Sequence, residues 1–490
     1  MLRVKSTLAT GVAMLVTVSG LAGCDGVPPE DGAVNGGAAP AGEGVLASGF
    51  YIDPYKSVLA RDVGVVDDDT RTQDPCLSTS STNISDKYWF FGYLLTQMAS
   101  GSTATSYSDF ARSWLKSWET STTLNNDSLV EVRAASGASA KPLATRIREA
   151  WQRKSGSTTL AMNRAPFRLL AIVNRFDLRK SPRRFGEGAS GELRFVFSPL
   201  DLDNGCQQYA NPVLVDKQGE QLVILEYVVD ISTAQAKRDW ILAWTDLTRS
   251  EPGTVEFNQG LEKLTQRVVT KGTGGSRPNG SALIRIRTNE TGDDLRWDLR
   301  EFNINASTHL VVPAVVKQTP RDSLNCTLPF PAPACSDNLG LWMQRNSSAI
   351  LADTYVLPDQ FPAGQGYSTT SFRGAHSSNK LANTFWVGGP RYGVASEVRH
   401  QFSKNTCSGC HSAETGTSFF HVHGRAKGEV APLSPFLTGV DCLGGSMTGC
   451  GTDLSGPPHC VADPVTGQQR CFGELDNRVS DILSYLNTGI

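Results

Sequence analysis

The sequence predicts an α+β fold, in which a large mixed α+β domain is followed by a small, mostly helical domain. From about residue 50 to residue 390, apolar runs typical of strands and segments with helical spacing come in groups. Such grouping, rather than strict alternation, favours α+β over a doubly wound parallel sheet. After residue 393 the segments with clear periodicity are helical. The length of 490 residues is sufficient for two or three domains.

The large domain, expected over residues 49–392, begins with helices rich in aromatic residues. Residues 85–98 have helical spacing, and Phe110, Trp114 and Trp118 recur every four residues on one helical face. Such a stripe could be a ligand surface, but apolar residues at this spacing normally face the protein interior. We therefore expect these three side chains in the core.

Strands and helices then follow in groups along the rest of this domain. Apolar runs predict strands at residues 167–173, 193–198 and 221–229. Helical spacing predicts helices at 233–246, 256–268 and 337–352, and further strands are expected at 281–288, 294–302 and 308–316. The sequence has no nucleophile elbow, phosphate-binding loop or His-Glu-x-x-His motif, so nothing here nominates a catalytic nucleophile.

Three polar stretches of the large domain are weaker candidates for a site. Residues 174–179 follow a strand and carry alternating charge, which suits a polar site but is more typical of a structural Arg–Asp ion pair. Residues 201–205 begin like a calcium loop, but Gly205 stands where the third ligand belongs and no glutamate closes the loop. The three aspartates at 67–69 are interpreted as a solvated acidic loop.

The clearest chemical signal is the motif Cys407-Ser-Gly-Cys410-His411, whose spacing is that of c-type haem attachment. Each thiol can add to one vinyl group of the porphyrin, and the adjacent histidine can bind the iron as proximal ligand. The same residues would also suit a structural or redox cysteine pair, or part of a zinc site, although no second ligand pair with finger-like spacing is obvious. We expect one covalent haem c.

The second axial ligand of such a haem has several candidates. His421 and His423 follow two aromatic residues that could exclude water, and they would give bis-histidine ligation with a lower potential. Met447 lies between two cysteines, in a loop that a disulfide could hold, and a thioether ligand would raise the potential. The sequence favours a histidine slightly and leaves the choice open.

Residues 393–490 resemble the small cytochrome c fold. Ser396 is expected to cap a helix on which Val398 and Phe402 share a face and which leads into the motif. A terminal helix is expected from apolar residues at helical spacing, namely Leu475, Val479, Ile482, Leu483 and Leu486. The resemblance implies that these two helices pack across each other. The wider pattern around the motif also resembles a group of uncharacterised bacterial lipoproteins.

The N-terminus predicts export and a lipid anchor. Basic residues precede a short apolar run at 8–18, which is typical of a secretory signal and not of a membrane-spanning helix. The following Leu-Ala-Gly-Cys24 resembles the bacterial lipobox, which implies removal of residues 1–23 and lipid attachment to Cys24. The alternative is an ordinary signal peptide with a coincidental cysteine. Residues 24–48, rich in Gly, Ala and Pro, are expected to form a flexible tether.

The chain has eleven cysteines, and their number favours disulfide bonds. Setting aside Cys24 for the lipid and the two cysteines of the haem motif leaves eight, and an even remainder is typical of an exported protein with disulfides. Proximity suggests three local pairs, and elimination suggests a fourth: Cys326–Cys335, Cys442–Cys450, Cys460–Cys471 and Cys76–Cys206. Sequence alone does not define connectivity, so free thiols are the alternative.

Together these patterns predict a membrane-anchored lipoprotein of the bacterial cell envelope, on its periplasmic or outer-membrane side. We expect it to transfer electrons through one haem to a redox partner protein. In a second hypothesis the large domain binds a substrate, and the chain is a haem-dependent oxidoreductase or peroxidase. In a third it is a non-haem surface lipoprotein that binds a partner, with Cys407 and Cys410 bridged. The net charge of −2 and the lack of a basic stripe do not indicate nucleic acid as a partner.

Overall fold

The computed structural model describes residues 45–489 except for 48–49, 78–80, 128–140, 181–189, 204, 209–220, 275–276, 292–295, 326–336, 368–370, 381–385, 387–392, 418 and 443–448. All described residues belong to one compact unit, Pro40–Ile490. The signal segment, Cys24, most of the tether, Cys326, Cys335 and Met447 lie outside the described residues. Val45–Ala47, expected in the tether, form strand β1, which pairs with β2 (Phe50–Ile52).

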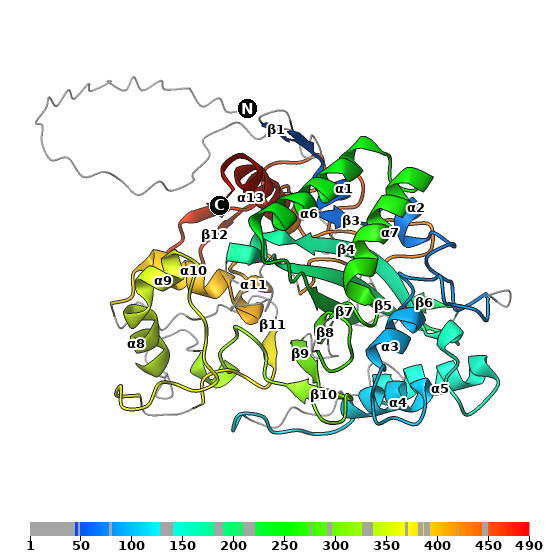
Figure 1. Cartoon of the computed structure of the whole chain (residues 1–490). Helices are drawn as coiled ribbons and strands as arrows, with labels where there is room; N and C mark the ends of the chain where they lie inside the picture. Colours follow the sequence, from blue (N-terminus) through cyan, green and yellow to red (C-terminus); the bar gives the residue numbers. More distant parts are fainter. Residues whose placement is uncertain are drawn as a thin grey trace, which may run out of the picture. The chain divides into compact units, whose positions relative to one another are not determined.

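A nine-stranded antiparallel sheet lies at the centre of the described structure (Figure 1). The strand order is β10-β9-β8-β7-β5-β4-β3, while β11 pairs with β9 and β6 pairs with β5. The strands are β3 (Leu59–Ala60), β4 (Phe167–Arg175), β5 (Glu192–Asp201), β6 (Gln207–Gln208), β7 (Gln221–Val228), β8 (Leu283–Thr291), β9 (Arg296–Ile304), β10 (Val311–Ala314) and β11 (Ser377–Lys380). All six predicted strands are present in this sheet, and the fold is a mixed α and β structure as expected.

The two faces of the sheet differ, because successive side chains of a strand point to opposite sides. On β7, Val223, Leu225 and Tyr227 are fully buried in the main apolar core. The core also contains apolar residues of α6 (Ala234–Asp246) and α7 (Val255–Val269), which lie across one face of the sheet (Figure 1). The alternate residues of β7 include Glu226, so the second face carries charge.

The aromatic helices of the N-terminal half belong to the core, as predicted. The helix expected at 85–98 is shorter, α3 (Phe91–Met98), because residues before it form turns in which the Trp89 amide donates to the Arg71 carbonyl. Phe110 and Trp114 lie on α4 (Tyr107–Ser117), and Trp118 is the residue that ends it. All three side chains are buried. The remaining short elements here are α1 (Pro54–Ser57), α2 (Val63–Val66), α5 (Leu143–Ser155), η1 (Met162–Arg164), η2 (Phe176–Lys180) and η3 (Leu247–Arg249).

The helices toward the C-terminus follow the predicted pattern with two differences. The helix expected at 337–352 is divided at Asn346 into α8 (Asp337–Arg345) and α9 (Ser347–Leu351). Ser396 is the first residue of α10 (Ser396–Lys404) and not its cap; Ala395 precedes the helix and makes no side-chain hydrogen bond. The other elements are η4 (Asp322–Leu324), α11 (Cys407–Cys410), α12 (Pro435–Thr438), β12 (Cys460–Ala462), β13 (Gln469–Cys471) and α13 (Glu474–Thr488).

The last hundred residues pack closely on the rest of the described chain. The apolar residues of α13 are buried, and the helix contacts α12, α1 and η2, whereas α10 contacts α8, α9 and α11. The Arg425 guanidinium donates to the Leu169 carbonyl of β4 at 3.0 Å and pairs with Asp67 at 2.7 Å. The main apolar cluster contains residues of both parts, and a second cluster joins α8 and α9 to Val398 and Phe402 of α10. The boundary between 392 and 393 and the crossing of α10 with α13 stay predictions.

Candidate functional site

Only two cysteines among the described residues are free, and both belong to the haem-type motif. The structure joins Cys76 with Cys206, Cys442 with Cys450, and Cys460 with Cys471, which are three of the four expected pairs. Cys407 and Cys410 are unbridged. Burial raises the pKa of the Cys407 thiol and raises that of Cys410 to about 12. Both thiols are therefore protonated at neutral pH.

The motif lies on a cavity between the charged face of the sheet and the C-terminal segment. The empty space of the cavity is about 1220 Å³, including its opening to solvent. Cys407, Cys410, His411 and His421 line it. The opposite wall consists of alternate residues of β4, β5, β7, β8 and β9. Apolar residues make up much of the surface: Leu59, Val173, Val196, Leu222, Ile224, Leu299, Val422, Phe436 and Leu437.

The one-turn helix α11 holds the two cysteines in place. Thr406 caps it, because its Oγ1 accepts a hydrogen bond from the Gly409 amide at 3.2 Å. The same hydroxyl accepts a bond from the indole of Trp386 at 2.8 Å. Gly409 packs directly on the end of α10, where a Cβ atom would lie 2.1 Å from the Ser403 carbonyl oxygen. Only glycine fits between the two cysteines at this contact.

Residues of the sheet region hold the motif from the other side. The Asn379 side-chain amide on β11 donates to the carbonyls of Ser408, at 3.3 Å, and His411, at 2.7 Å. The backbone amide of Cys407 donates to Thr319 Oγ1 at 3.1 Å. On β9, the buried indole of Trp297 stacks on the His411 ring with 4.4 Å between centroids and 20° between planes. The sequence did not indicate the contacts made by these three residues.

The His411 ring has one nitrogen engaged and one available. Its Nδ1 lies 2.6 Å from the carbonyl oxygen of Phe419, so Nδ1 carries the proton and donates it. Burial lowers the pKa of His411 to about 4, so the ring is neutral at neutral pH. Nε2 then keeps its lone pair. A neutral imidazole whose other nitrogen donates to a carbonyl is the usual state of a metal-binding histidine.

Of the candidates for a second axial ligand, His421 lies closest to the motif. Its ring centroid is 4.4 Å from that of His411, and its Nε2 is 3.3 Å from the Cys410 sulfur. Its Nδ1 lies 2.9 Å from Ser434 Oγ. Burial and the neighbouring His411 lower the pKa of His421 well below its ordinary value. His423 is buried beside Phe420 and is not a lining residue of this cavity.

His459, which also lies in the last hundred residues, is unsuitable as an axial ligand. His459 has both ring nitrogens engaged, with Nδ1 at 2.6 Å from Asp441 and Nε2 at 2.8 Å from the Thr415 carbonyl. Burial lowers the pKa of His423 to about 4, so that ring is neutral as well. Met447 lies outside the described residues. Of these candidates His421 lines the cavity and His423 does not, and the identity of the second axial ligand stays a prediction.

Arginine and glutamate side chains alternate across the cavity face of the sheet. Arg194 lies opposite Glu226, which in turn lies opposite Arg285, and Arg287 lies opposite Glu301. The Glu226 carboxylate is 3.3 Å from Arg194 and 3.4 Å from Arg285. Burial alone would raise the pKa of Glu226 and Glu301, but the arginines outweigh it and lower both. The carboxylates stay ionised and the buried charges compensate one another.

The weaker polar candidates have mainly structural roles. Arg175 and Asp177 form the expected ion pair at 2.7 Å, and Arg175 also lines the main cavity. Asp201 and Asp203 of the discounted calcium-like loop face the arginines of α5, Arg146 and Arg153. Asn204 lies outside the described residues.

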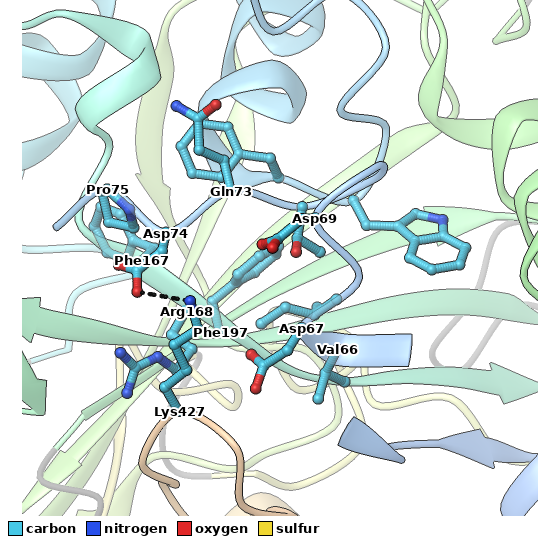
Figure 2. A pocket seen from close by; sticks show the side chains of 14 residues that line it. Val66, Asp67, Asp69, Gln73, Asp74, Pro75, Phe167, Arg168, Phe197 and Lys427 are labelled. Atoms are coloured by element: carbon cyan, nitrogen blue, oxygen red, sulfur yellow. Dashed lines mark ion pairs between the residues drawn. The ribbon is translucent and has the colours of Figure 1, made fainter. Parts of the chain in front are cut away.

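The acidic loop at 67–69 is not simply solvated, contrary to expectation. Asp67 accepts from the buried guanidinium of Arg425, and Asp68 pairs with Arg71 at 2.7 Å, while Asp69 is exposed. Figure 2 shows Asp67 and Asp69 at a second, smaller pocket of about 380 Å³, where Asp74 pairs with Lys427 at 3.4 Å. Because cationic side chains already pair with Asp67 and Asp74, this pocket is a weak candidate for a ligand site.

A buried cluster of possible metal ligands lies beside the motif. His400, Glu414 and Asp463 have ligand atoms within 4.8 Å of one another. The guanidinium of Arg399 donates to Glu414 at 2.7 and 2.8 Å and to Asp463 at 2.7 Å. Its positive charge occupies the position that a cation would take. We therefore interpret the cluster as a structural charge network that joins α10, the loop after the motif and the β12–β13 hairpin.

Comparison of the chain with protein families, curated proteins and solved structures finds no match. None of the described helices is both long and apolar enough to cross a bilayer. The chemistry of the cavity therefore has to be argued from its own residues.

Proposed function

We propose that this chain is an exported, lipid-anchored c-type cytochrome, with one haem bound covalently by Cys407 and Cys410, that transfers electrons. The observation that supports this most strongly is the set of groups on one cavity: two unbridged thiols and the free Nε2 of His411. The haem would supply the redox chemistry, while the protein sets its ligation and surroundings. The likeness of residues 393–490 to a small cytochrome c belongs to this proposal.

The cavity wall is compatible with a porphyrin. Its apolar side chains offer a surface for the macrocycle, and apolar surroundings exclude water from the iron. Trp297, Asn379 and Thr319 would keep the motif in position against the sheet. These contacts favour a preorganised attachment site.

The competing interpretations of the motif have less support. A redox-active Cys-x-x-Cys pair needs a thiol with a lowered pKa, whereas burial raises the pKa of both cysteines. A surface lipoprotein with Cys407 and Cys410 bridged is at odds with the two free thiols. The single group of potential metal ligands found among the described residues does not include the motif.

The test is covalent haem attachment in a host that matures c-type cytochromes. We expect the wild-type chain to keep its haem through denaturation and acid–acetone extraction, because thioether bonds are covalent. Haem attachment should also remove two titratable thiols per chain. Cys407→Ala/Cys410→Ala should hold no covalent haem, whereas the matched control Cys460→Ala/Cys471→Ala also loses two cysteines but should keep it. A wild-type chain that releases its haem on extraction would refute the proposal.

A haem-dependent oxidoreductase or peroxidase is the second candidate function. The observation that favours it is the size of the cavity together with its charged wall, where Glu226, Arg287 and Asn289 lie opposite the motif. Such a wall could bind a polar substrate beside the iron. A high-spin ferric spectrum of the wild-type chain would indicate an open iron position and favour this function over electron transfer.

Membrane anchoring rests on Cys24 and the segment before it. Cys24→Ser should abolish fatty-acid labelling and release the chain from membranes, because the acyl chains provide the anchor. Membrane fractionation before and after a high-salt wash, with radiolabelled palmitate as a parallel readout, measures both effects. If Cys24→Ser stays in the membrane fraction and the wild type takes up no fatty acid, the anchor is of another kind.

A further inference from the structure

Three of the arginines on the cavity have unused hydrogen-bond donors. They are Arg175 at the end of β4, Arg194 on β5 and Arg478 on α13. Each pairs with a carboxylate two or four residues away in sequence. The closest distances are 2.7 Å from Arg175 to Asp177, 2.6 Å from Arg194 to Glu192 and 3.1 Å from Arg478 to Glu474.

In all three pairs the same part of the guanidinium is used. The carboxylates accept from Nε and Nη2. Because a guanidinium has five N–H donors, each Nη1 keeps two that these bonds leave unused. Among the described residues, none of these three Nη1 atoms is both fully buried and without a hydrogen-bond partner. These donors can therefore be reached through the cavity.

All three guanidinium groups line the same cavity, and Arg478 is repelled by the other two. Burial lowers the pKa of Arg478, and the charges of Arg175 and Arg194 contribute to the lowering. Arg175 and Arg478 also act on the nearby His421 of the motif region. An anion beside these arginines relieves the repulsion and makes charge-assisted hydrogen bonds. The apolar wall next to them suits a ligand with an apolar body and carboxylates at one edge.

We propose that Arg175, Arg194 and Arg478 form a carboxylate-binding site, and that its ligands are the two propionate groups of the bound haem. The inference rests on the proposed haem attachment. It assigns to the large domain a direct part in cofactor binding, because Arg175 and Arg194 belong to the sheet. A soluble carboxylate is the other possible source of the same chemistry.

The experiment uses the full chain with its haem attached, in wild-type form and as Arg478→Gln, Arg478→Lys and Arg194→Gln. Arg249→Gln is the control, because the side chain of Arg249 is 83% exposed. Covalent haem content is measured first. The midpoint potential is then followed against pH, and the propionate bending bands are recorded by resonance Raman spectroscopy. A final titration adds succinate to the wild type and to Arg478→Gln.

We expect covalent haem in all forms and a lower midpoint potential in both Gln variants. Oxidised haem carries one more positive charge than reduced haem, so the loss of a nearby positive charge stabilises the oxidised form relative to the reduced form. The pH at which the potential begins to change should rise, since a propionate without its arginine has a higher pKa. The propionate bands should shift, and Arg478→Lys should lie between wild type and Arg478→Gln. Arg249→Gln should match the wild type, and succinate should change neither form.

Unchanged potentials, pH profiles and Raman bands in both Gln variants would overturn the inference. An Arg478-dependent response of the wild type to succinate would also overturn it and assign the site to a soluble carboxylate. Absence of covalent haem from the wild type would instead refute the proposed function, and with it this inference. If Arg478→Gln does not fold, Arg194→Gln and Arg478→Lys provide the same comparison.

Discussion

Replacing Arg399 with methionine is expected to lower the free energy of unfolding by about 3–5 kcal/mol at neutral pH. The side chains of Arg399, Glu414 and Asp463 are all fully buried. Methionine fills much of the same space but removes the closest cation of two buried carboxylates, leaving Glu414 with His400 and Asp463 with the more distant Arg470 at 3.7 Å. The loss of a charge partner inside the protein costs far more than the loss of a surface ion pair.

The pH dependence of the stability loss in Arg399→Met distinguishes a lost charge interaction from a packing defect. Burial alone would raise the pKa of Glu414, but hydrogen bonds from His400 and Arg399 outweigh burial and lower it. Burial is likewise outweighed at Asp463, where backbone amides and Arg399 lower the pKa. The pKa values of Glu414 and Asp463 in the folded protein lie below their ordinary values of 4.5 and 3.8. The stabilisation by these carboxylates is therefore present above the ordinary pKa values and is lost as the pH falls through the pKa values of the folded protein. The difference between wild type and Arg399→Met should therefore shrink in acid.

Urea unfolding at pH 7 and at pH near 3 measures this difference, with Arg249→Met as control. Arg249 and its partner Asp246 are exposed, so the control should change stability by less than about 0.5 kcal/mol. An equally large loss at both pH values would indicate lost packing and contradict the electrostatic explanation. Covalent haem content is a second readout, because Glu414 follows His411 closely in the loop after the motif.

Replacing His421 with alanine should convert a low-spin ferric haem into a high-spin one, whereas His423→Ala should leave the spectrum low-spin. The reason is position: His421 lines the cavity beside His411, and its Nε2 lies near the Cys410 sulfur. His423 is also a neutral imidazole and is more buried than the partly buried His421, so it controls for the loss of a buried imidazole. The ferric absorption spectrum and the midpoint potential measure the change.

The rival ligand Met447 has a distinct signature. A methionine-ligated haem shows a sulfur-to-iron charge-transfer band and a higher potential than a bis-histidine haem. If the wild type shows this band and only Met447→Ala abolishes it, His421 is not the ligand. If the wild type is already high-spin, neither residue binds the iron, and the oxidoreductase or peroxidase becomes the favoured function.

Most helices and strands could be predicted, because their signal is local. The long apolar runs of β4 and β7 and the helical spacing of α6, α7 and α13 reflect which face each element buries, and burial leaves a periodic pattern. The errors occur at the ends of elements. Ser396 has the composition of a cap, but the backbone enters the helix one residue earlier. Residues before α3 have helical spacing, yet a hydrogen bond to Arg71 holds them in turns.

The haem-type motif and most of the disulfide pairs could also be predicted from the sequence, because covalent chemistry requires a particular spacing. Cys407, Cys410 and His411 are recognisable within five residues. The bond between Cys460 and Cys471 follows from proximity on one hairpin, and Cys76–Cys206 followed only from counting. The solvated loop expected at 67–69 was wrong, since its partner Arg425 comes from a segment far away in the chain.

By itself the sequence determined the secondary structure, the haem-type motif and its small-residue turn, because each depends on neighbours along the chain. Only the tertiary structure decided what surrounds the motif. Strand register gathers alternate residues of five strands on one face, and the C-terminal segment then covers that face. Trp297, Asn379 and the cavity arginines meet His411 for this reason. No local sequence pattern predicts these contacts, because they arise from the packing of segments that are distant in the chain.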